Sequence, residues 1–497
     1  MPPQNIEDLF YILVSQPTED HLLRDDDMAS LIRLCTRALV AYSLVHATGD
    51  ATAAAAQAPV PPSRKTVAAL SATIDSIAES HRTQQSIPGL SIAITTISGK
   101  VLYTRGYGFA DVASRQPVTS ATIFHIYSIS KVYASTLVHQ LVQAGRLSLG
   151  APVGQYLPDL PAWRNTVTVR QLLAHTSGIE DYTDVTGYQE AMNAGRADDD
   201  RFVALALQQP LRFPPGSHWR YTSTAYVLIQ QLTERLTGEP FGQSLVTRVL
   251  APGSLDATSA DCAMGPPATG YTWAWRAGLT GDSLVVSKAR NAHQHHLAAG
   301  GLCSTPVDVA RFFALLLGGH LVDSASVADM VRLVPIAIAH SGSGLFARED
   351  DEGLILEHSG GGGNGNSEVM AFPRDSIILS AAANSGGAEL EWLLRALRRR
   401  ILDLPERVVV DLPVSRDEIA PLLGVYVGTE SDGRIVVDER GGRLFAMNTR
   451  LLKQADGTFV PASSPHLRLT FRVENGVGTE VIVSKYGLVE SHWRRRP

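Results

Sequence analysis

The sequence predicts an α+β protein in which an antiparallel sheet carries helices on both faces and is followed by a small all-β domain. A helix-period segment, two strand-period segments and a second, strongly apolar helix follow one another from residue 64. Short alternating segments split by Asp-Gly, Gly-Gly and Asn-Gly turns fill residues 417–497, as is typical of a small antiparallel barrel or sandwich. The 497 residues exceed one ordinary domain, and 44% hydrophobic with 19% charged residues can bury a large core.

Residues 1–63 form an N-terminal extension. Its first part, 1–27, is acidic and resembles no targeting signal. From Met28, two arginines, the apolar stretch ALVAYSLVHA and the small residues AAAAQA at 53–58 have the layout of a secretory signal peptide. The apolar stretch is too short for a membrane span. We therefore expect Met28 to be the true start and the protein to be periplasmic or secreted. The alternative is a cytoplasmic chain with an added amphipathic helix and an Ala/Pro linker.

Charge and cysteine content exclude some functions. A net charge of −6 without a basic patch predicts no nucleic-acid partner. Cys35, Cys262 and Cys303 show neither metal-ligand spacing nor a disulfide framework, so the redox compartment and a Cys262–Cys303 pair stay open. The histidine run NAHQHH at 291–296 has no carboxylate or cysteine nearby to complete a ligand set, and we predict no metal site there.

The main domain is expected over residues 64–401, with a linker over 402–416. An amphipathic helix over 64–85 is predicted by the spacing of Val67, Leu70, Ile74 and Ile77. LSIAITTI and GKVLYTRGYGFAD then form two strands of a hairpin with Ser98-Gly99 at the turn. Residues 353–384 supply two strands around a glycine run, and a helix over 388–401 closes the domain.

The segment Ser128-Ile129-Ser130-Lys131 begins a helix that is apolar nearly all round. Its apolar positions recur at helical spacing: Ala134, Leu137, Val138, Leu141 and Val142. Ser128 and Lys131 share a face one turn apart. Burial disfavours an ammonium ion, and the neutral amine can then accept the serine proton. On its own the S-x-x-K motif is weak, because an ordinary helix start with a serine cap gives the same letters.

Further candidate residues lie at the ends of other elements. Tyr221 precedes an apolar helix and is either a packing aromatic or a phenol that shuttles protons near Ser128. His175 in LLAHTSG is predicted to satisfy backbone groups at a turn rather than to act as a base. Thr305-Pro306 starts a helix with a threonine cap and proline at its first position. The glycines of HSGG, 358–361, let a backbone lie close to a ligand with free N–H groups.

Five motifs occur together in a fixed order over about residues 65–400: Ser128-x-x-Lys131, LLAHTSG, PPG-x-x-x-x-YTS, AAGGL-x-ST and HSGG. In this the chain resembles the penicillin-binding-protein and class C β-lactamase superfamily of serine hydrolases, which includes D-peptidases, D-aminopeptidases and family VIII esterases. The resemblance implies an antiparallel sheet with flanking helices, an all-helical lobe and an active site between them. It also implies a lipocalin-like β-barrel over 417–497.

The resemblance assigns roles residue by residue. Ser128 matches the acyl-forming nucleophile, Lys131 the base, and Tyr221 the tyrosine that relays the proton to the leaving group. His358 stands where the third motif has lysine. The N–H groups of Ser128 and Gly361 fall where the family builds its oxyanion hole, with Gly360 beside them on the substrate side.

Two departures bear on the substrate. Ser223 replaces the asparagine of the Y-x-N triplet and is too short to reach as far. Tyr127 stands before the nucleophile, where glycine or alanine is commoner, and we expect it to narrow the pocket. The run GGGGNGN after His358 predicts a mobile rim.

The function that these residues imply is acyl transfer from a small peptide, amide or ester, without a metal or an organic cofactor. A D-aminopeptidase or D-stereospecific peptidase is favoured by His358 and the barrel. A family VIII carboxylesterase or a β-lactamase is the alternative. A non-catalytic penicillin-binding sensor is the alternative of another class.

Overall fold

The computed structural model describes residues 64–193, 197–260, 262, 267–273, 283–287, 296–332, 342–350, 353–404, 409–428, 434–446, 449–462, 467–485 and 488–496. The predicted signal peptide and Cys35 lie outside these residues, as do His293 and His295 of the histidine run. Within the described part of the chain, no helix combines the length and apolarity needed to cross a membrane.

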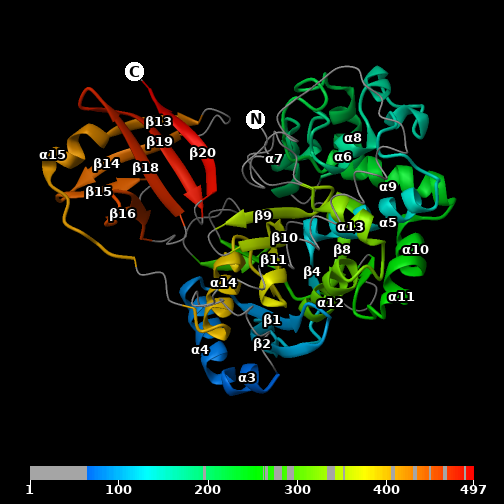
Figure 1. The fold of residues 1–497 in the computed structure, drawn as a ribbon, viewed down its shortest axis with the longest axis horizontal. Coiled ribbons are helices and arrows are strands. Elements are labelled where there is room, and N and C mark those ends of the chain that lie inside the picture. Colours follow the sequence, from blue (N-terminus) through cyan, green and yellow to red (C-terminus); the bar gives the residue numbers. More distant parts are fainter. Residues whose placement is uncertain are drawn as a thin grey trace, which may run out of the picture. The chain divides into compact units, whose positions relative to one another are not determined.

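A seven-stranded antiparallel sheet in the order β3-β2-β1-β12-β11-β10-β9 forms the centre of the main domain (Figure 1). Its strands are β1 (Gly89–Thr96), β2 (Val101–Asp111), β3 (Gln116–Pro117), β9 (Phe346–Asp350), β10 (Gly353–Gly362), β11 (Gly365–Phe372) and β12 (Ile377–Ala383). The predicted β1–β2 hairpin is confirmed, and Gly99 at its turn has φ +83°. Residues 353–384 hold three strands rather than the predicted two, because the turn Pro373–Asp375 and Ser376 at φ +57° reverse the chain once more.

Helices cover both faces of this sheet, as predicted. Because side chains alternate along a strand, Leu379 and Met370 pack in one buried core while their neighbours Ile378 and Val369 pack in the other. The first core is completed by α3 (Arg64–Ala69), α4 (Ser71–Gln84) and α14 (Leu390–Ile401). The second is completed by α12 (Pro306–Leu317) and the helical lobe. Thr305 caps α12 as predicted, its Oγ1 accepting the Asp308 N–H at 3.3 Å.

The helical lobe is built around α5 (Ser130–Gln143), whose residues from Ser130 to His139 are all buried. Around it lie α6 (Val169–Leu173), α7 (Tyr188–Asn193), α8 (Asp199–Gln208), α9 (Thr224–Thr237), α10 (Phe241–Leu245), α11 (Ala251–Gly253) and α13 (Ser324–Met330). A small sheet in the order β4-β8-β5 joins β4 (Phe124–His125), β8 (Leu302–Ser304) and β5 (Ser259–Ala260). A second small sheet pairs β6 (Tyr271–Trp273) with β7 (Leu284–Val286).

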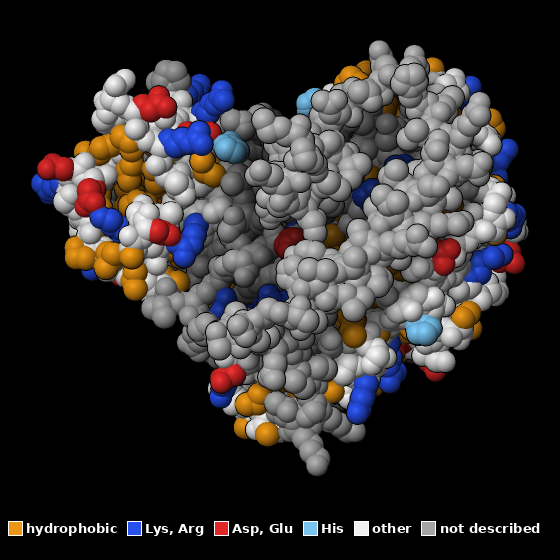
Figure 2. Space-filling model, viewed as in Figure 1, with side chains coloured by type: hydrophobic (Ala, Val, Ile, Leu, Met, Phe, Trp, Pro, Cys, Tyr) orange, Lys and Arg blue, Asp and Glu red, His pale blue; other side chains and the backbone are white. Residues whose placement is uncertain are grey.

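The C-terminal segment is a closed eight-stranded barrel, which decides between the predicted barrel and sandwich. After the short helix α15 (Arg416–Ile419) come β13 (Gly424–Gly428), β14 (Arg434–Arg440), β15 (Arg443–Ala446), β16 (Thr449–Lys453), β17 (Phe459–Pro461), β18 (Leu467–Glu474), β19 (Val477–Lys485) and β20 (Leu488–Arg495). The sequence pattern missed β16, where adjacent Leu451 and Leu452 break the alternation. The barrel has its own core, including Tyr426 and Val481, and Figure 2 shows apolar side chains among charged ones on its surface.

Candidate active site

The candidate nucleophile lies on a short 3-10 helix, η1 (Tyr127–Ile129), directly before α5. Two contacts hold the residue that precedes this turn. The Ile126 N–H donates to the Leu302 carbonyl of β8 at 3.0 Å, and the Ser367 hydroxyl of β11 donates to the Ile126 carbonyl at 2.9 Å. Ser128 is thereby placed by strands that lie far from it in sequence.

Lys131 lies on the first turn of α5 with its side chain fully buried. Its Nζ is 3.1 Å from Ser128 Oγ, 3.5 Å from Ser223 Oγ and 2.6 Å from the Ala299 carbonyl. The Ala299 carbonyl belongs to the π-helical turn η6 (Leu297–Gly301), formed by the AAGGL motif. This contact gives the AAGGL motif a structural role, because it holds the amine beside the serine.

The protonation state of Lys131 follows from its surroundings. Burial lowers its pKa to about 7, and the nearby Asp181 carboxylate opposes that shift by favouring the ammonium form. The Nζ also lies 4.9 Å from the Tyr221 ring centroid and 5.5 Å from that of Tyr226. At neutral pH a large fraction of the amine is therefore neutral and has a lone pair for the Ser128 proton.

Tyr221 lies close to the same pair. A hydrogen bond joins its hydroxyl to that of Ser128, while burial raises the pKa of Tyr221. The phenol therefore stays protonated at neutral pH. Lys131 therefore has the lone pair that a base needs, whereas Tyr221 is a proton donor.

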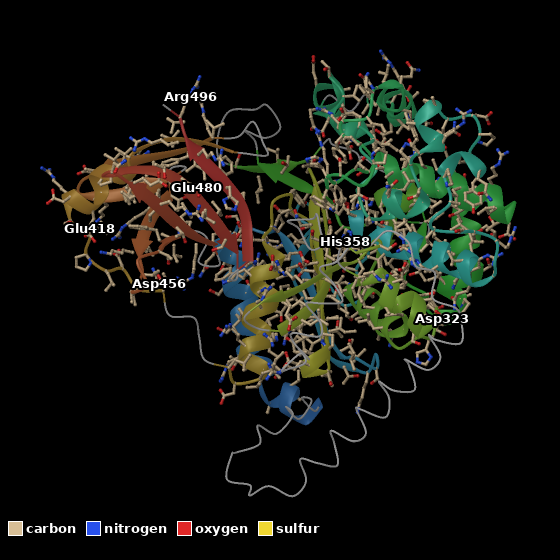
Figure 3. All side chains as sticks on the ribbon, turned by 45° about the horizontal axis from the view of Figure 1, so that its top comes forward. Asp323, His358, Glu418, Asp456, Glu480 and Arg496 are labelled. Atoms are coloured by element: carbon tan, nitrogen blue, oxygen red, sulfur yellow. A yellow bond between two sulfur atoms is a disulfide. The ribbon has the colours of Figure 1, made fainter. Side chains whose placement is uncertain are left out.

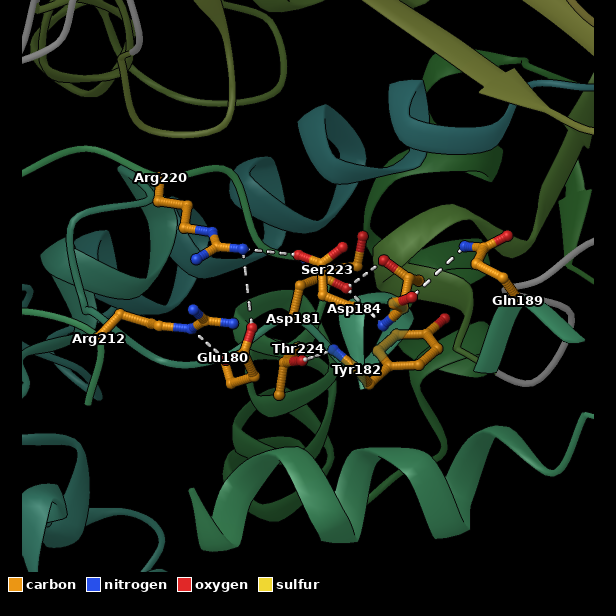
Figure 4. Close-up of polar contacts among 10 residues, drawn as sticks. Glu180, Asp181, Tyr182, Asp184, Gln189, Arg212, Arg220, Ser223 and Thr224 are labelled. Atoms are coloured by element: carbon orange, nitrogen blue, oxygen red, sulfur yellow. Dashed lines mark hydrogen bonds and ion pairs between the residues drawn. The ribbon is translucent and has the colours of Figure 1, made fainter. Parts of the chain in front are cut away.

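Asp181 is a buried carboxylate that the sequence analysis missed. One of its oxygens accepts the Ser223 N–H, and the other accepts the Thr183 N–H at 2.8 Å (Figure 4). The neighbouring Tyr182 N–H donates to Thr224 Oγ1 at 2.8 Å, so two residues at the start of α9 are tied to this loop. The sequence signal was an acidic residue in the segment after LLAHTSG. Only the folded chain brings Asp181 close to Lys131.

The outer side of the same loop carries ion pairs whose arginines are partly exposed. Arg220 lies 2.9 Å from Asp184 and 3.9 Å from Glu180, and Arg212 pairs with Glu180 as well (Figure 4). Arg220 and Asp184 are both more than a third exposed, so their pair stabilises the fold little, whereas Glu180 is nearly buried. Glu180 and Asp184, the acidic partners in these pairs, lie on either side of Asp181 in the chain.

His175 satisfies backbone groups at a turn, as predicted. Its backbone has φ +59°, its Nδ1 accepts the Thr222 N–H at 3.2 Å and its carbonyl accepts the Arg220 N–H at 2.9 Å. Its ring also stacks on Tyr221 with centroids 4.3 Å apart. Burial, Lys131 and His358 hold the pKa of His175 well below its usual value, so the ring is neutral. His175 thus supports the phenol directly, which the turn prediction did not include.

His358 lies on β10 with its side chain buried (Figure 3). Its Nδ1–H donates to the Ser359 carbonyl at 2.6 Å, and the ring stacks on Phe346 with centroids 4.7 Å apart. Burial and the nearby Lys131 lower the pKa of His358 to about 3. The residue that replaces the lysine of the third motif is therefore uncharged, with its Nε2 lone pair as an acceptor.

The glycines after His358 make room for the nucleophile segment. A Cβ on Gly360 would collide with the Ile126 carbonyl oxygen, so β10 can approach the turn before Ser128 only without a side chain there. Tyr127, at φ +46°, is buried against the glycine run: a Cβ on Gly362 would lie 2.5 Å from its ring and one on Gly365 2.7 Å from its hydroxyl oxygen. Its hydroxyl donates to Asn364 Oδ1 at 2.8 Å.

The predicted mobile rim is a paired hairpin in the structure. Gly360, Gly361 and Gly362 of β10 pair with Ser367, Asn366 and Gly365 of β11. The unusual tyrosine before the nucleophile and the glycine run therefore form one packing unit. The structure thus accounts for Tyr127, one of the two departures from the family pattern, by its packing against the glycine run.

The structure brings Ser128, Lys131, Tyr221 and Ser223 together and places His358 close to Lys131. A buried amine near neutrality beside a hydroxyl has the chemistry of an activated nucleophile. The sequence pattern that defines the beta-lactamase family matches residues 71–403. The chain belongs to the beta-lactamase family. This family consists of hydrolases. The proteins that are similar to this chain include amidases and an esterase.

Among curated relatives, Protein flp of Staphylococcus aureus is 26% identical over 349 residues, which span 66% of each chain. Esterase EstB of Burkholderia gladioli is 30% identical over 198 residues, covering 37% of this chain and 50% of the esterase. The matched stretches therefore span about half to two thirds of these relatives.

Solved structures share the fold. The octameric penicillin-binding protein homologue of Pyrococcus abyssi superposes with TM-score 0.60 at 21% identity, over 85% of this chain and 99% of its own. D-amino acid amidase of Ochrobactrum anthropi SV3 superposes with a TM-score of 0.58 at 24% identity, over 67% of this chain and 99% of its own. D-stereospecific amidohydrolase of a Streptomyces species gives 0.54 at 25% identity, over 62% and 93%.

Proposed function

We propose that this protein is a serine hydrolase that forms an acyl-enzyme at Ser128 and acts on D-aminoacyl amides or short peptides. The observation that carries the proposal is the Lys131 amine, 3.1 Å from Ser128 Oγ with a pKa of about 7. In the first step Lys131 accepts the Ser128 proton while Oγ attacks the substrate carbonyl carbon. The N–H groups of Ser128 and Gly361 would stabilise the oxyanion, and Tyr221 would protonate the leaving amine. Water then hydrolyses the ester at Ser128.

The neutral His358 supports an amide or N-terminal substrate over one with a free carboxylate. A lysine at this position would present a cation, whereas a histidine with a pKa of about 3 presents an uncharged acceptor. An acceptor matches the N–H of an amide or the ammonium of an amino acid. The likeness to D-stereospecific amidohydrolase, which is 25% identical, supports the same choice.

The direct test is intact-mass analysis after treatment with a fluorophosphonate probe or penicillin. The wild type should gain one adduct and Ser128→Ala none. Ser130→Ala, which changes the neighbouring serine of the same helix start, should keep the adduct. A wild type without an adduct would show that the protein is a non-catalytic member of the fold.

Substrate class is tested with matched pairs of D- and L-aminoacyl amides and of peptides with free or amidated C-termini. We expect D-amides to react faster than L-amides, and amidated peptides faster than those with a free carboxylate. His358→Lys should reverse the second preference, because it adds a cation at this place. Equal rates for free and amidated peptides in both proteins would contradict the role given to His358.

An esterase is the second candidate, favoured by the 30% identity to Esterase EstB over 198 residues. An ester alcohol needs less protonation than an amine to leave, so the same residues suit it. Brisk cleavage of p-nitrophenyl acetate or butyrate with no reaction on D-aminoacyl amides would select the esterase. Fast turnover of nitrocefin would select a β-lactamase instead.

A further inference from the structure

Two cysteines and a histidine meet on the small β4-β8-β5 sheet, outside the site described above. His125 of β4 is the direct strand partner of Cys303 of β8. Cys303 also pairs with Ser259 of β5, and Cys262 follows two residues after that strand. The structure joins Cys262 and Cys303 in a disulfide whose Cα atoms are 5.0 Å apart. The strand pairing therefore places both cysteine sulfurs close to the imidazole of His125.

The donor atoms have the spacing of a metal-ligand set. His125 Nδ1 lies 3.2 Å from Cys303 Sγ and 3.6 Å from Cys262 Sγ, and the three donor atoms lie within 4.8 Å of one another. A tetrahedral Zn²⁺ with Zn–N of about 2.0 Å and Zn–S of about 2.3 Å places nitrogen and sulfur about 3.5 Å apart. The two N···S distances bracket that value. Only the two sulfurs have to separate, by rotation of the Cys262 side chain on its turn.

We propose that the reduced form of this cluster binds a thiophilic divalent cation such as Zn²⁺ through His125, Cys262 and Cys303. Thiolate and imidazole ligands are those that Zn²⁺ favours, and three protein ligands leave a fourth position for water. Cys303 is fully buried, whereas His125 and Cys262 are partly exposed. Solvent, reductant and ion can therefore reach the cluster from the side of His125 and Cys262.

The disulfide and the metal site exclude each other. A dithiol reductant transfers two electrons and two protons to the Cys262–Cys303 bond, giving two thiols and the oxidised cyclic disulfide of the reductant. Zn²⁺ then displaces both thiol protons and takes the Nδ1 lone pair of a neutral His125. Oxidation reverses the sequence and releases the ion. The compartment of the protein thus selects the state: a disulfide after export, a metal site in a reducing cytosol.

The cluster lies next to the parts that hold the candidate nucleophile and base. Leu302, beside Cys303, accepts the Ile126 N–H at 3.0 Å and donates its own N–H to Ser130 Oγ at 3.2 Å. The turn just before β8 carries the Ala299 carbonyl that binds Lys131 at 2.6 Å. Either cross-link, covalent or metallic, joins β8 to the segment after β5, and the bound ion would add β4 through His125. Breaking both should loosen the strands that position Ser128.

The test uses the full chain carrying Cys35→Ser, so that Cys262 and Cys303 are its remaining thiols. The protein is reduced without denaturation, the thiols are counted, and Co²⁺ is added as a spectroscopic probe before Zn²⁺ displaces it. We expect two thiols, one bound Co²⁺ per chain with a thiolate charge-transfer band and intense visible bands of tetrahedral Co²⁺, and loss of both on oxidation. Zn²⁺ should also raise the unfolding temperature of the reduced protein.

Three variants and one control locate the site. Cys262→Ser, Cys303→Ser and His125→Asn should each lose the charge-transfer band or weaken it. Cys262→Ser, on a partly exposed turn, keeps the test valid if the buried Cys303→Ser does not fold. His293→Gln with His295→Gln alters the histidine run and should leave binding unchanged. Binding that survives in Cys262→Ser and disappears in the histidine-run control would overturn the proposal. So would a disulfide that resists reduction in the folded protein, or a reduced protein that binds no Co²⁺.

Discussion

Lys131 carries out its proposed role only when its amine is neutral. Its pKa of about 7 therefore predicts that kcat/KM rises with pH and levels off above about 7. The sign follows because protonation below that pH occupies the lone pair that Ser128 needs. Rates on an uncharged substrate between pH 5 and 10 test this. A rate that still rises steeply at pH 10, as the ordinary lysine pKa of 10.5 would require, would contradict it.

Loss of the base Lys131 or of the proton relay Tyr221 should lower kcat/KM strongly. Lys131→Ala and Tyr221→Phe are each expected to lower kcat/KM by about 10²–10⁴-fold, the usual contribution of a positioned acid or base. The two losses should not add, since both groups belong to one relay that takes the proton from Ser128 and delivers a proton to the leaving amine. Single-turnover measurements on both variants and on the double variant test this. Retained turnover in either single variant would remove its assigned role.

Asp181 adjusts the base from a distance. Its carboxylate favours the ammonium form of Lys131, so Asp181→Asn should lower the Lys131 pKa further and move the acid limb of kcat/KM to lower pH. The asparagine oxygen can still accept the Ser223 N–H, so the loop is expected to stay in place. Asp184→Asn, an exposed change on the same loop, is the matched control and should leave the limb unmoved. A limb that moves to higher pH in Asp181→Asn would contradict the electrostatic assignment.

At the scale of elements, β10 and the turn η1 pack against each other through the Tyr127 ring and the glycine run after His358. Gly362→Ala should cost about 1–3 kcal/mol of stability, because its Cβ would lie 2.5 Å from the Tyr127 ring. Tyr127→Gly removes the ring and also suits φ +46°, so the double variant should be more stable than the two separate losses predict.

Denaturant unfolding of the four proteins gives the coupling energy between the two positions. Gly150→Ala is the control, since its Cβ would meet nothing within 4 Å, and its cycle with Tyr127→Gly should be additive. Additivity between Gly362→Ala and Tyr127→Gly would show that the glycine run is not shaped by this ring.

At the scale of the whole molecule, the main domain and the barrel have separate buried cores. Among the described residues, the barrel core draws its members from residues 414–493, whereas neither of the two large cores of the main domain extends beyond Leu402. We expect calorimetry to show two unfolding transitions, with the fluorophosphonate-labelled Ser128 shifting only one of them. Limited proteolysis should cut first between Leu402 and Val414. One cooperative transition in which both parts unfold together would contradict this.

Export remains a prediction of the sequence alone. We propose that the chain starts at Met28 and is cleaved close to residues 53–58. N-terminal sequencing of the mature protein should then begin just after this segment. A mature chain that still carries residues 28–58 would favour the cytoplasmic alternative, and with it the reduced state of Cys262 and Cys303.

Much of the fold could be predicted because it follows from the local spacing of apolar residues. The β1–β2 hairpin, α5, α12 with its Thr305 cap and α14 all follow from apolar spacing and capping residues. The third strand within 353–384 was missed because Pro373 and Ser376 turn the chain without a glycine. In the barrel, the strand that holds Leu451 was missed because its apolar residues do not alternate.

The sequence by itself determined which residues can react. Helical spacing puts Ser128 and Lys131 one turn apart, and the ordered motifs supply Tyr221 and His358. What only the tertiary structure decided is how those residues are charged. The Ala299 carbonyl is 168 residues from Lys131 in the chain, and Asp181 comes from a separate loop. The pKa of a buried group depends on every dipole and charge around it, and chain folding alone brings these together.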